Sequence, residues 1–192
     1  EIQQHCISCT PFPLNPETGD LQADVRERGR LKFSADSLDF FATDGSAGIS
    51  ASNRIRGVVL HDILAKVVVA DDLDQAVADA LASGEISSDE QPEVEELLSR
   101  RIEEGVARGW FPDDPDKVLN ETSLIDSDGQ IYRPDRVVMN GSDVIVIDYK
   151  FGEHHRKYER QMAGYADIWK RMGYENVSAV LWYVQTGECV IL

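Results

Sequence analysis

Apolar residues recur at helical spacing in the first regular part of the chain. Over residues 54–69 they fall three or four positions apart, which predicts a buried helix that carries His61. Two further helices are predicted over residues 72–83 and 88–108, with Gly84 between them. A later stretch, residues 155–172, again places its apolar residues on one helical face.

The second half of the chain changes to strand patterns. Alternating or continuous apolar runs with turn residues between them predict strands at residues 117–126, 130–139, 143–151, 176–185 and 189–192. The first three are joined by turns at residues 127–130 and at Asn140-Gly141, so an antiparallel meander is expected. The order helices, three strands, helix, strand predicts an α/β fold with a mixed sheet flanked by helices.

Length and composition point to one domain. The 192 residues, 42% hydrophobic and 28% charged, suit a single globular domain, which we assign to residues 54–192. Residues 1–53 hold early Pro and Gly residues without a sustained period, so an extended lead-in with one short strand near residues 31–33 is expected. Because the chain begins with Glu1, we expect a fragment of a longer polypeptide.

Charge and apolar content limit the cellular location and the partners that can be expected. No stretch reaches the length of a membrane span and no signal peptide is visible, so we expect a cytoplasmic protein without membrane contact. A net charge of −16 argues against binding nucleic acid through the overall field. A local basic cluster could still do so, or could be an ordinary solvated helix start; it comprises Lys150, His154, His155, Arg156, Lys157 and Arg160.

The three cysteines do not form a recognisable metal site. Cys6 and Cys9 make a CxxC pair, and Cys189 lies at the far end of the chain. A closed zinc or iron–sulfur site needs four soft ligands, so reduced thiols and no iron–sulfur cluster are expected.

Two aspartates at neighbouring strand ends are the first candidates for chemistry. The Asn140-Gly141 turn makes their strands neighbours, so Asp135 and Asp148 can lie close together. Paired carboxylates beside apolar strands are costly unless a cation lies between them, and Mg²⁺ prefers oxygen ligands. Lys150 could then orient a water or neutralise charge on a phosphate. The alternative is a set of strand-end salt bridges with Arg133, Arg136 and Lys150.

Other candidates are weaker alone. His61 on an apolar helix is more often a core residue than a ligand. Glu121 could add a carboxylate or simply face water. Gln161 and Tyr165 stand four apart on one helical face, so both could reach the same bound backbone or could form the polar edge of a core stripe.

Several of these stretches occur in an order that resembles a known family. The chain resembles the RecB-type branch of the PD-(D/E)xK nuclease superfamily, and more narrowly the C-terminal nuclease domain of UvrD-like or AddA-like helicase-nucleases. The resemblance covers roughly residue 54 to the end. The segments that carry it are RGVVLH with His61, RPDRV with Asp135, DYKFG with Asp148 and Lys150, Tyr158 with the QMAGY that spans Gln161 and Tyr165, and the closing LWYV.

The resemblance implies a restriction-endonuclease-like fold and assigns roles. It implies that His61, Asp135, Asp148 and the backbone carbonyl of Tyr149 hold Mg²⁺ or Mn²⁺, with Glu121 as an additional acidic position. Asp135, Asp148 and Lys150 would be the catalytic residues. The residues expected to contact DNA are Gln161 and Tyr165 of a QxxxY motif, together with Tyr158, Arg133 and Arg136.

The expected function follows from that resemblance. We expect a metal-dependent DNA nuclease, an exonuclease, that acts in repair on single-stranded DNA from an attached helicase or partner helicase-nuclease subunit. No GxxxxGK[ST] motif occurs, so ATP binding would belong to the helicase domains. The alternatives are a catalytically silent DNA-end-binding or scaffolding module and a standalone nuclease. The presence of both aspartates and the lysine favours an enzyme.

Overall fold

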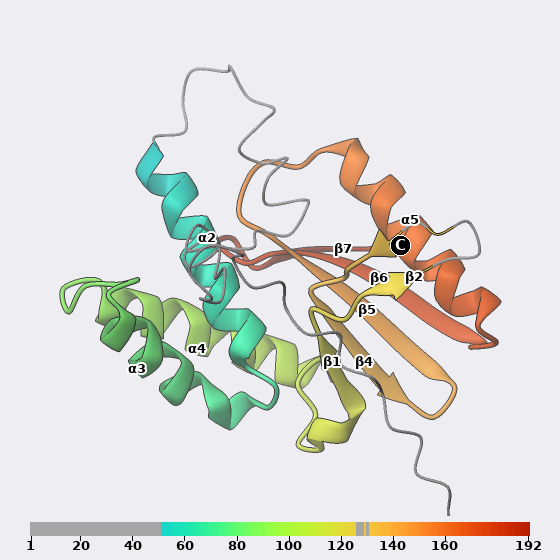
Figure 1. Cartoon of the computed structure of the whole chain (residues 1–192), viewed down its shortest axis with the longest axis horizontal. Helices are drawn as coiled ribbons and strands as arrows, with labels where there is room; N and C mark the ends of the chain where they lie inside the picture. Colours follow the sequence, from blue (N-terminus) through green and yellow to red (C-terminus); the bar gives the residue numbers. More distant parts are fainter. Residues whose placement is uncertain (1–50, 126–128, 130) are drawn as a thin grey trace, which may run out of the picture.

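Five strands form the central sheet of the part that the computed structural model describes, which is residues 51–125, 129 and 131–192. In spatial order they are β1 (Val118–Asn120), β4 (Arg136–Asn140), β5 (Asp143–Lys150), β6 (Asn176–Tyr183) and β7 (Glu188–Ile191). Only β5 and β6 are parallel, and the other neighbours are antiparallel (Figure 1). The prediction of a mixed sheet flanked by helices is confirmed.

The helices agree closely with the predicted ones. They are α2 (Ala51–Lys66), α3 (Leu73–Ser83), α4 (Gln91–Ala107) and α5 (Arg156–Arg171), with short 3-10 turns η2 (Ala70–Asp72) and η3 (Pro115–Lys117). The predicted lead-in at residues 1–53 lies outside the described residues except for its last three, which belong to α2. Cys6, Cys9 and the strand near residues 31–33 also lie outside, as does the turn at 127–130 apart from Gly129.

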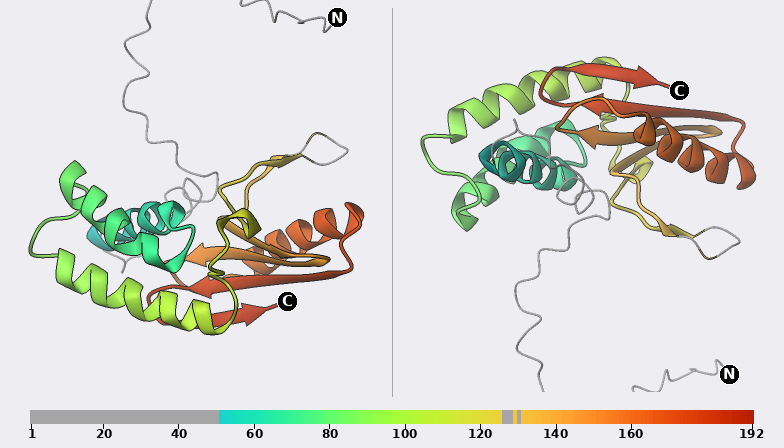
Figure 2. Two further views of the ribbon diagram at one scale, coloured as in Figure 1. Left: turned by 90° about the horizontal axis from the view of Figure 1, so that it is seen from below. Right: turned by 90° about the horizontal axis from the view of Figure 1, so that it is seen from above.

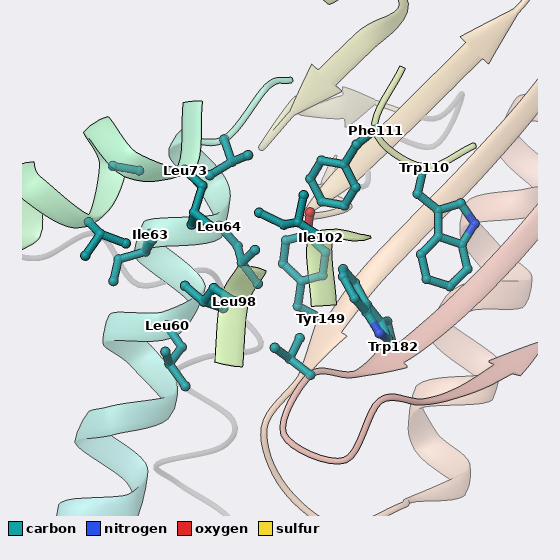
Figure 3. Close-up of a cluster of buried hydrophobic side chains, with 14 of the residues drawn as sticks. Leu60, Ile63, Leu64, Leu73, Leu98, Ile102, Trp110, Phe111, Tyr149 and Trp182 are labelled. Atoms are coloured by element: carbon teal, nitrogen blue, oxygen red, sulfur yellow. The ribbon is translucent and has the colours of Figure 1, made fainter. Parts of the chain in front are cut away.

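Each face of the sheet is covered by its own helices. Apolar residues of α2, α3 and α4 pack on one face, and those of α5 pack on the other. Figure 2 shows α5 separated by the sheet from the group of three helices. In the larger core, Trp182 makes edge contacts with Trp110, Phe111 and Tyr149, at ring distances of 5.2, 6.2 and 5.7 Å (Figure 3). Because both faces are covered, β5 and β6 are apolar on both sides, as expected for central strands.

The connection between β5 and β6 explains the position of α5. Two parallel neighbouring strands cannot be joined by a tight turn, so the chain crosses over through α5. The β4–β5 pair instead uses the predicted tight turn at Asn140-Gly141, where Gly141 has φ 66°. The end of β5 therefore leads directly into the start of α5.

The predicted meander is wrong in one respect, because two of its strands are broken. The predicted strand 117–126 is β1 followed by β2 (Leu124–Ile125), and 130–139 is β3 (Ile131–Tyr132) followed by β4. β2 and β3 pair only with each other, in a hairpin that stands out from the main sheet (Figure 2). The break falls at Glu121, with φ 51°, on one side and at Pro134, which has no amide hydrogen, on the other.

The described helices include none that is both long enough and apolar enough to cross a membrane.

Candidate metal centre

Three side chains from three separate segments meet at the broken strands. His61 of α2, Glu121 just after β1 and Asp135 just before β4 each bring one ligand atom within 4.8 Å of the others. Nε2 of His61 lies 3.0 Å from Oδ1 of Asp135 and 3.4 Å from Oε1 of Glu121. These three side chains are called the acidic cluster below.

The position of His61 depends on the close approach of α2 to the end of β5. A Cβ added to Gly57 would lie 3.0 Å from Cβ of Phe151, so the glycine lets the helix pass close to that residue. One turn later the imidazole ring makes edge contacts with Tyr149 at 6.1 Å and with Phe151 at 6.5 Å. The rings of Tyr149 in β5 and of Phe151 just after it therefore orient the imidazole whose Nε2 meets Asp135.

Asp135 is held by the main chain of β5. Its Oδ2 accepts a hydrogen bond of 2.6 Å from the amide of Tyr149, while Oδ1 meets His61. Its own carbonyl accepts a 3.0 Å bond from the amide of Glu121. Asp135 thus joins the two sides of the bent hairpin, and the backbone of Tyr149 lies beside its carboxylate.

Glu121 carries two signs of a functional position. It is the only non-glycine residue with positive φ among residues 51–125, 129 and 131–192, and such backbone strain concentrates at functional sites. Its Oε1 is buried and makes no hydrogen bond with any described residue, whereas Oε2 lies 3.4 Å from Nη1 of Arg133. A buried carboxylate oxygen without a hydrogen bond is costly. The His61 imidazole at 3.4 Å offsets part of that cost, and a bound cation would offset more.

The charges of the cluster are strongly coupled. Burial opposes the charged form of His61, but the Asp135 carboxylate, with help from Asp62 and Glu121, outweighs it and raises the pKa to about 11. Burial likewise opposes ionisation of Asp135, yet His61, Lys150 and the Tyr149 amide hold the pKa of that carboxyl below its usual range. Burial, followed by the Asp135 charge, raises the pKa of Glu121. In the absence of a metal, a protonated imidazole therefore offsets the two acids.

Asp148 and Lys150 form a second pair next to the cluster. Asp148 is 1% exposed and makes an ion pair with Lys150, whose ammonium lies 4.4 Å from the ring centre of Tyr158. Antiparallel pairing of Arg136 with Ile147 brings the chain at Asp135 beside Asp148. The Asp148 carboxylate is not one of the three tightly grouped ligands, because it is directed to the lysine. The continuous strand predicted over residues 130–139 is wrong at this point, since Asp135 lies in the break between β3 and β4.

The residues expected to contact DNA differ in how exposed they are. Arg133 is exposed, and Tyr158 and Gln161 are partly exposed. Tyr165 is buried; its hydroxyl donates to the carbonyl of Arg133 at 3.2 Å and accepts from the Gln161 amide at 2.9 Å. Gln161 and Tyr165 thus support the loop that carries Arg133, on the same side of the sheet as Lys150.

The prediction that Arg136 contacts DNA is wrong. Its side chain is 0% exposed and its guanidinium binds backbone carbonyls of Trp110, Val67 and Val68. Nothing in the local sequence distinguishes this buried arginine from its exposed neighbour Arg133, because its partners are distant in the chain. The sequence alone does not single out Glu121 as a ligand, since no local sequence pattern predicts a positive φ at a glutamate.

The residues present fit a hard divalent cation. The two carboxylates supply oxygen ligands of the kind that suit Mg²⁺ and Mn²⁺, and the imidazole adds a nitrogen ligand. The buried Oε1 of Glu121 lacks a hydrogen bond to any described group. The Tyr149 backbone lies beside the Asp135 carboxylate, and Asp148 precedes Tyr149 in β5. The arrangement can bind a metal on one side and present the Lys150 ammonium on the other.

Comparison with known proteins agrees with this site. A search of curated proteins found no match to the chain. A family model described as the PD-(D/E)XK nuclease superfamily matches residues 28–190. The five-stranded mixed sheet between helices is consistent with the restriction-endonuclease-like fold of that superfamily, and the acidic cluster suits the divalent metals that its nucleases typically use. The chain belongs to the PD-(D/E)XK nuclease superfamily, whose activity is that of a nuclease-type hydrolase.

Proposed function

We propose that this chain is a Mg²⁺- or Mn²⁺-dependent deoxyribonuclease that hydrolyses phosphodiester bonds of single-stranded DNA. The observation that carries the proposal is the convergence of His61, Glu121 and Asp135 within 4.8 Å, beside the buried Asp148–Lys150 pair. We further propose that it acts from a DNA end, as a RecB-type exonuclease supplied by a helicase of the same chain or a partner subunit during repair.

The residues divide into a metal-binding group and a charge-stabilising group. His61, Glu121 and Asp135 would hold the ion, with Asp148 and the Tyr149 carbonyl as the remaining protein ligands. A bound divalent ion would lower the pKa of a water and polarise the phosphate. Lys150 supplies a fixed positive charge for the negative charge that develops on the phosphate, and Asp148 and the Tyr158 ring hold its ammonium in place.

The DNA strand would run along the start of α5. This helix has five basic and two acidic residues, a net charge of +3 in a chain whose total is −16. Arg156, Lys157 and Arg160 are exposed at its first turns, next to Tyr158 and Lys150. Together with Arg133 and Gln161 they provide contacts for a few phosphates only, so weak, salt-sensitive binding is expected. Delivery by a helicase would compensate for that weakness.

The test is metal-dependent degradation of end-labelled DNA. We expect the chain with Mn²⁺ to shorten single-stranded DNA faster than a matched duplex, and the activity to be lost in Asp148→Asn and Lys150→Ala. Asp143→Asn is the matched control, because it changes the exposed acid at the other end of the same strand. Equal activity in all four proteins would indicate a contaminating nuclease and defeat the proposal.

The remaining parts of the proposal have separate readouts. A product ladder that shortens from the labelled end indicates an exonuclease, whereas internal fragments contradict that choice. Tight, nanomolar binding of single-stranded DNA by the isolated chain at physiological salt would contradict helicase delivery. Tight end binding without any metal-dependent cleavage would support the silent DNA-end-binding module instead.

A further inference from the structure

A buried arginine beside the acidic cluster is not used by the proposed chemistry. Arg136 donates from Nε to the carbonyl of Trp110 at 2.7 Å, from Nη1 to Val67 at 2.8 Å and from Nη2 to Val68 at 2.7 Å. Its guanidinium lies 4.0 Å over the ring of Phe111. Three nitrogens of one planar group therefore join two separate chain segments, and burial lowers the pKa of the group.

Asn120 completes this network. Its Nδ2 donates to the carbonyls of Ala65 at 3.0 Å and Val67 at 2.9 Å, and its Oδ1 accepts a 3.2 Å bond from Arg136 Nη1. α2 ends at Lys66, so carbonyls at and just beyond its last turn need partners from outside the helix. A cation at this end also interacts favourably with the helix dipole. Arg136 and Asn120 together hold the C-terminal end of α2.

These two residues are direct neighbours of the cluster carboxylates. Asn120 precedes Glu121, Arg136 follows Asp135, and Asn120 and Arg136 are cross-strand partners in the β1–β4 pairing. The helix end that they hold belongs to the helix that carries His61. One hydrogen-bond network thus connects the three segments that supply the three clustered ligands.

We propose that Arg136 and Asn120 are positioning residues that set the spacing of His61 from Glu121 and Asp135, and through it the affinity for a divalent metal. The inference rests on the proposed function, in that the acidic cluster is taken to hold the ion. Neither residue touches the cluster's ligand atoms through its side chain; each acts by holding α2 against the bend of the hairpin. A lysine has no planar fork, so it cannot bond all three carbonyls at position 136.

The chain contains a matched control for a merely structural role. Arg101 is also buried and also donates to backbone carbonyls, from Nε to Val184 at 2.6 Å and from Nη2 to Gln185 at 3.0 Å. It supports the turn between β6 and β7 and has no cluster residue beside it in the chain. Arg101→Lys therefore removes the same kind of interaction from a different place.

The experiment measures Mn²⁺ affinity by electron paramagnetic resonance in the wild type, Arg136→Lys, Asn120→Asp and Arg101→Lys, at a temperature where each is folded. We expect Arg136→Lys and Asn120→Asp to weaken binding about tenfold or more, as residues that orient metal ligands do. Arg101→Lys should lower the unfolding temperature but leave Mn²⁺ affinity within about twofold of wild type. Equal affinity in all four proteins, or equal losses in all three variants, would overturn the inference.

A metal-free readout separates this inference from the proposed function. The His61 ring resonances, observed by NMR, should move in Arg136→Lys and Asn120→Asp and stay in place in Arg101→Lys. If the wild type fails to bind Mn²⁺, the proposed function fails, and these resonances alone decide the positioning role. If Arg136→Lys does not fold, Asn120→Asp decides, because it removes both amide donors to α2 while keeping an oxygen acceptor for Arg136. Unmoved resonances in the folded variants would overturn the inference.

Discussion

The amide of Tyr149 donates a 2.6 Å hydrogen bond to Oδ2 of Asp135, at the place where β4 has not yet begun and β5 is about to end. A side chain here takes the hydrogen bond that a neighbouring strand would otherwise accept. The carboxylate is thereby fixed on one oxygen, and its other oxygen meets His61 at 3.0 Å. An acid held in this way is oriented before any ligand arrives.

Asp135→Asn should lower the pKa of His61 well below about 11, because Asp135 supplies the main charge that outweighs the burial of the imidazole. The measurement is an NMR titration of the His61 ring in metal-free protein. Asp62→Asn is the control, since Asp62 lies 3.6 Å from Nδ1 and should have the smaller effect. A larger fall in Asp62→Asn would contradict the arrangement of charges described here.

The stability contributed by His61 should depend on pH with a defined sign. Its pKa rises on folding from 6.5 to about 11, so its stabilising contribution is fully present below 6.5 and is lost as the pH rises through about 11. Chemical denaturation of metal-free wild type and His61→Gln should therefore show the largest difference near neutral or lower pH and a shrinking difference above it. A difference that grows with pH would show that the imidazole is neutral in the folded protein.

Binding of Mn²⁺ should release a proton at neutral pH. The metal-free imidazole is protonated because its pKa is about 11, whereas a metal ligand must be neutral. Calorimetric titrations in buffers of different ionisation enthalpy measure the number of protons released. His61→Gln should release fewer protons than the wild type, and equal release would remove the histidine from the ligand set.

Lys150→Met should separate turnover from metal binding. We expect the rate of cleavage to fall by about 10²–10³, the usual effect of removing one group that stabilises transition-state charge, while Mn²⁺ still binds. Without metal the variant should lose about 3–5 kcal/mol of stability, because the substitution removes one member of a buried ion pair. Lys66→Met, at an exposed pair of 3.8 Å with Glu85, should change neither quantity.

Trp182→Ala should cost about 3–5 kcal/mol of unfolding free energy, because the ring is 1% exposed and meets three other aromatic rings. Denaturant unfolding measures the loss. Met172→Ala, at a 58% exposed position, should stay within about 0.5 kcal/mol of wild type. Similar losses at the two positions would contradict the core described here.

The regular elements could be predicted because their signal is local. α5 alternates buried and exposed residues at helical spacing, and β5 is a continuous apolar run bounded by a turn. The break at Glu121 could not be predicted, because a positive φ at a glutamate is imposed by the surrounding structure. The same holds for Arg136, whose burial depends on carbonyls of residues 67, 68 and 110.

Part of the candidate site can be predicted from the sequence. Strand position predicts Asp135, Asp148 and Lys150 as site residues, and the family resemblance adds His61. The structure brings His61 and Asp135 to 3.0 Å and pairs Asp148 with Lys150. The unbroken strand predicted over residues 130–139 does not hold at Asp135, because this residue lies between β3 and β4, and strand alternation applies only within an unbroken strand. The metal-binding role of all four residues stays a prediction that the experiments above decide.

His61 and Asp135 touch across 74 positions of sequence. During synthesis the helix of His61 leaves the ribosome well before the strands that bear the acids and Lys150. An N-terminal fragment that ends before these strands therefore lacks the acids and the lysine of the candidate site. The complete candidate site would then form only when the whole domain has folded. For the deoxyribonuclease proposed above, DNA cleavage would therefore be expected only after the whole domain has been synthesised.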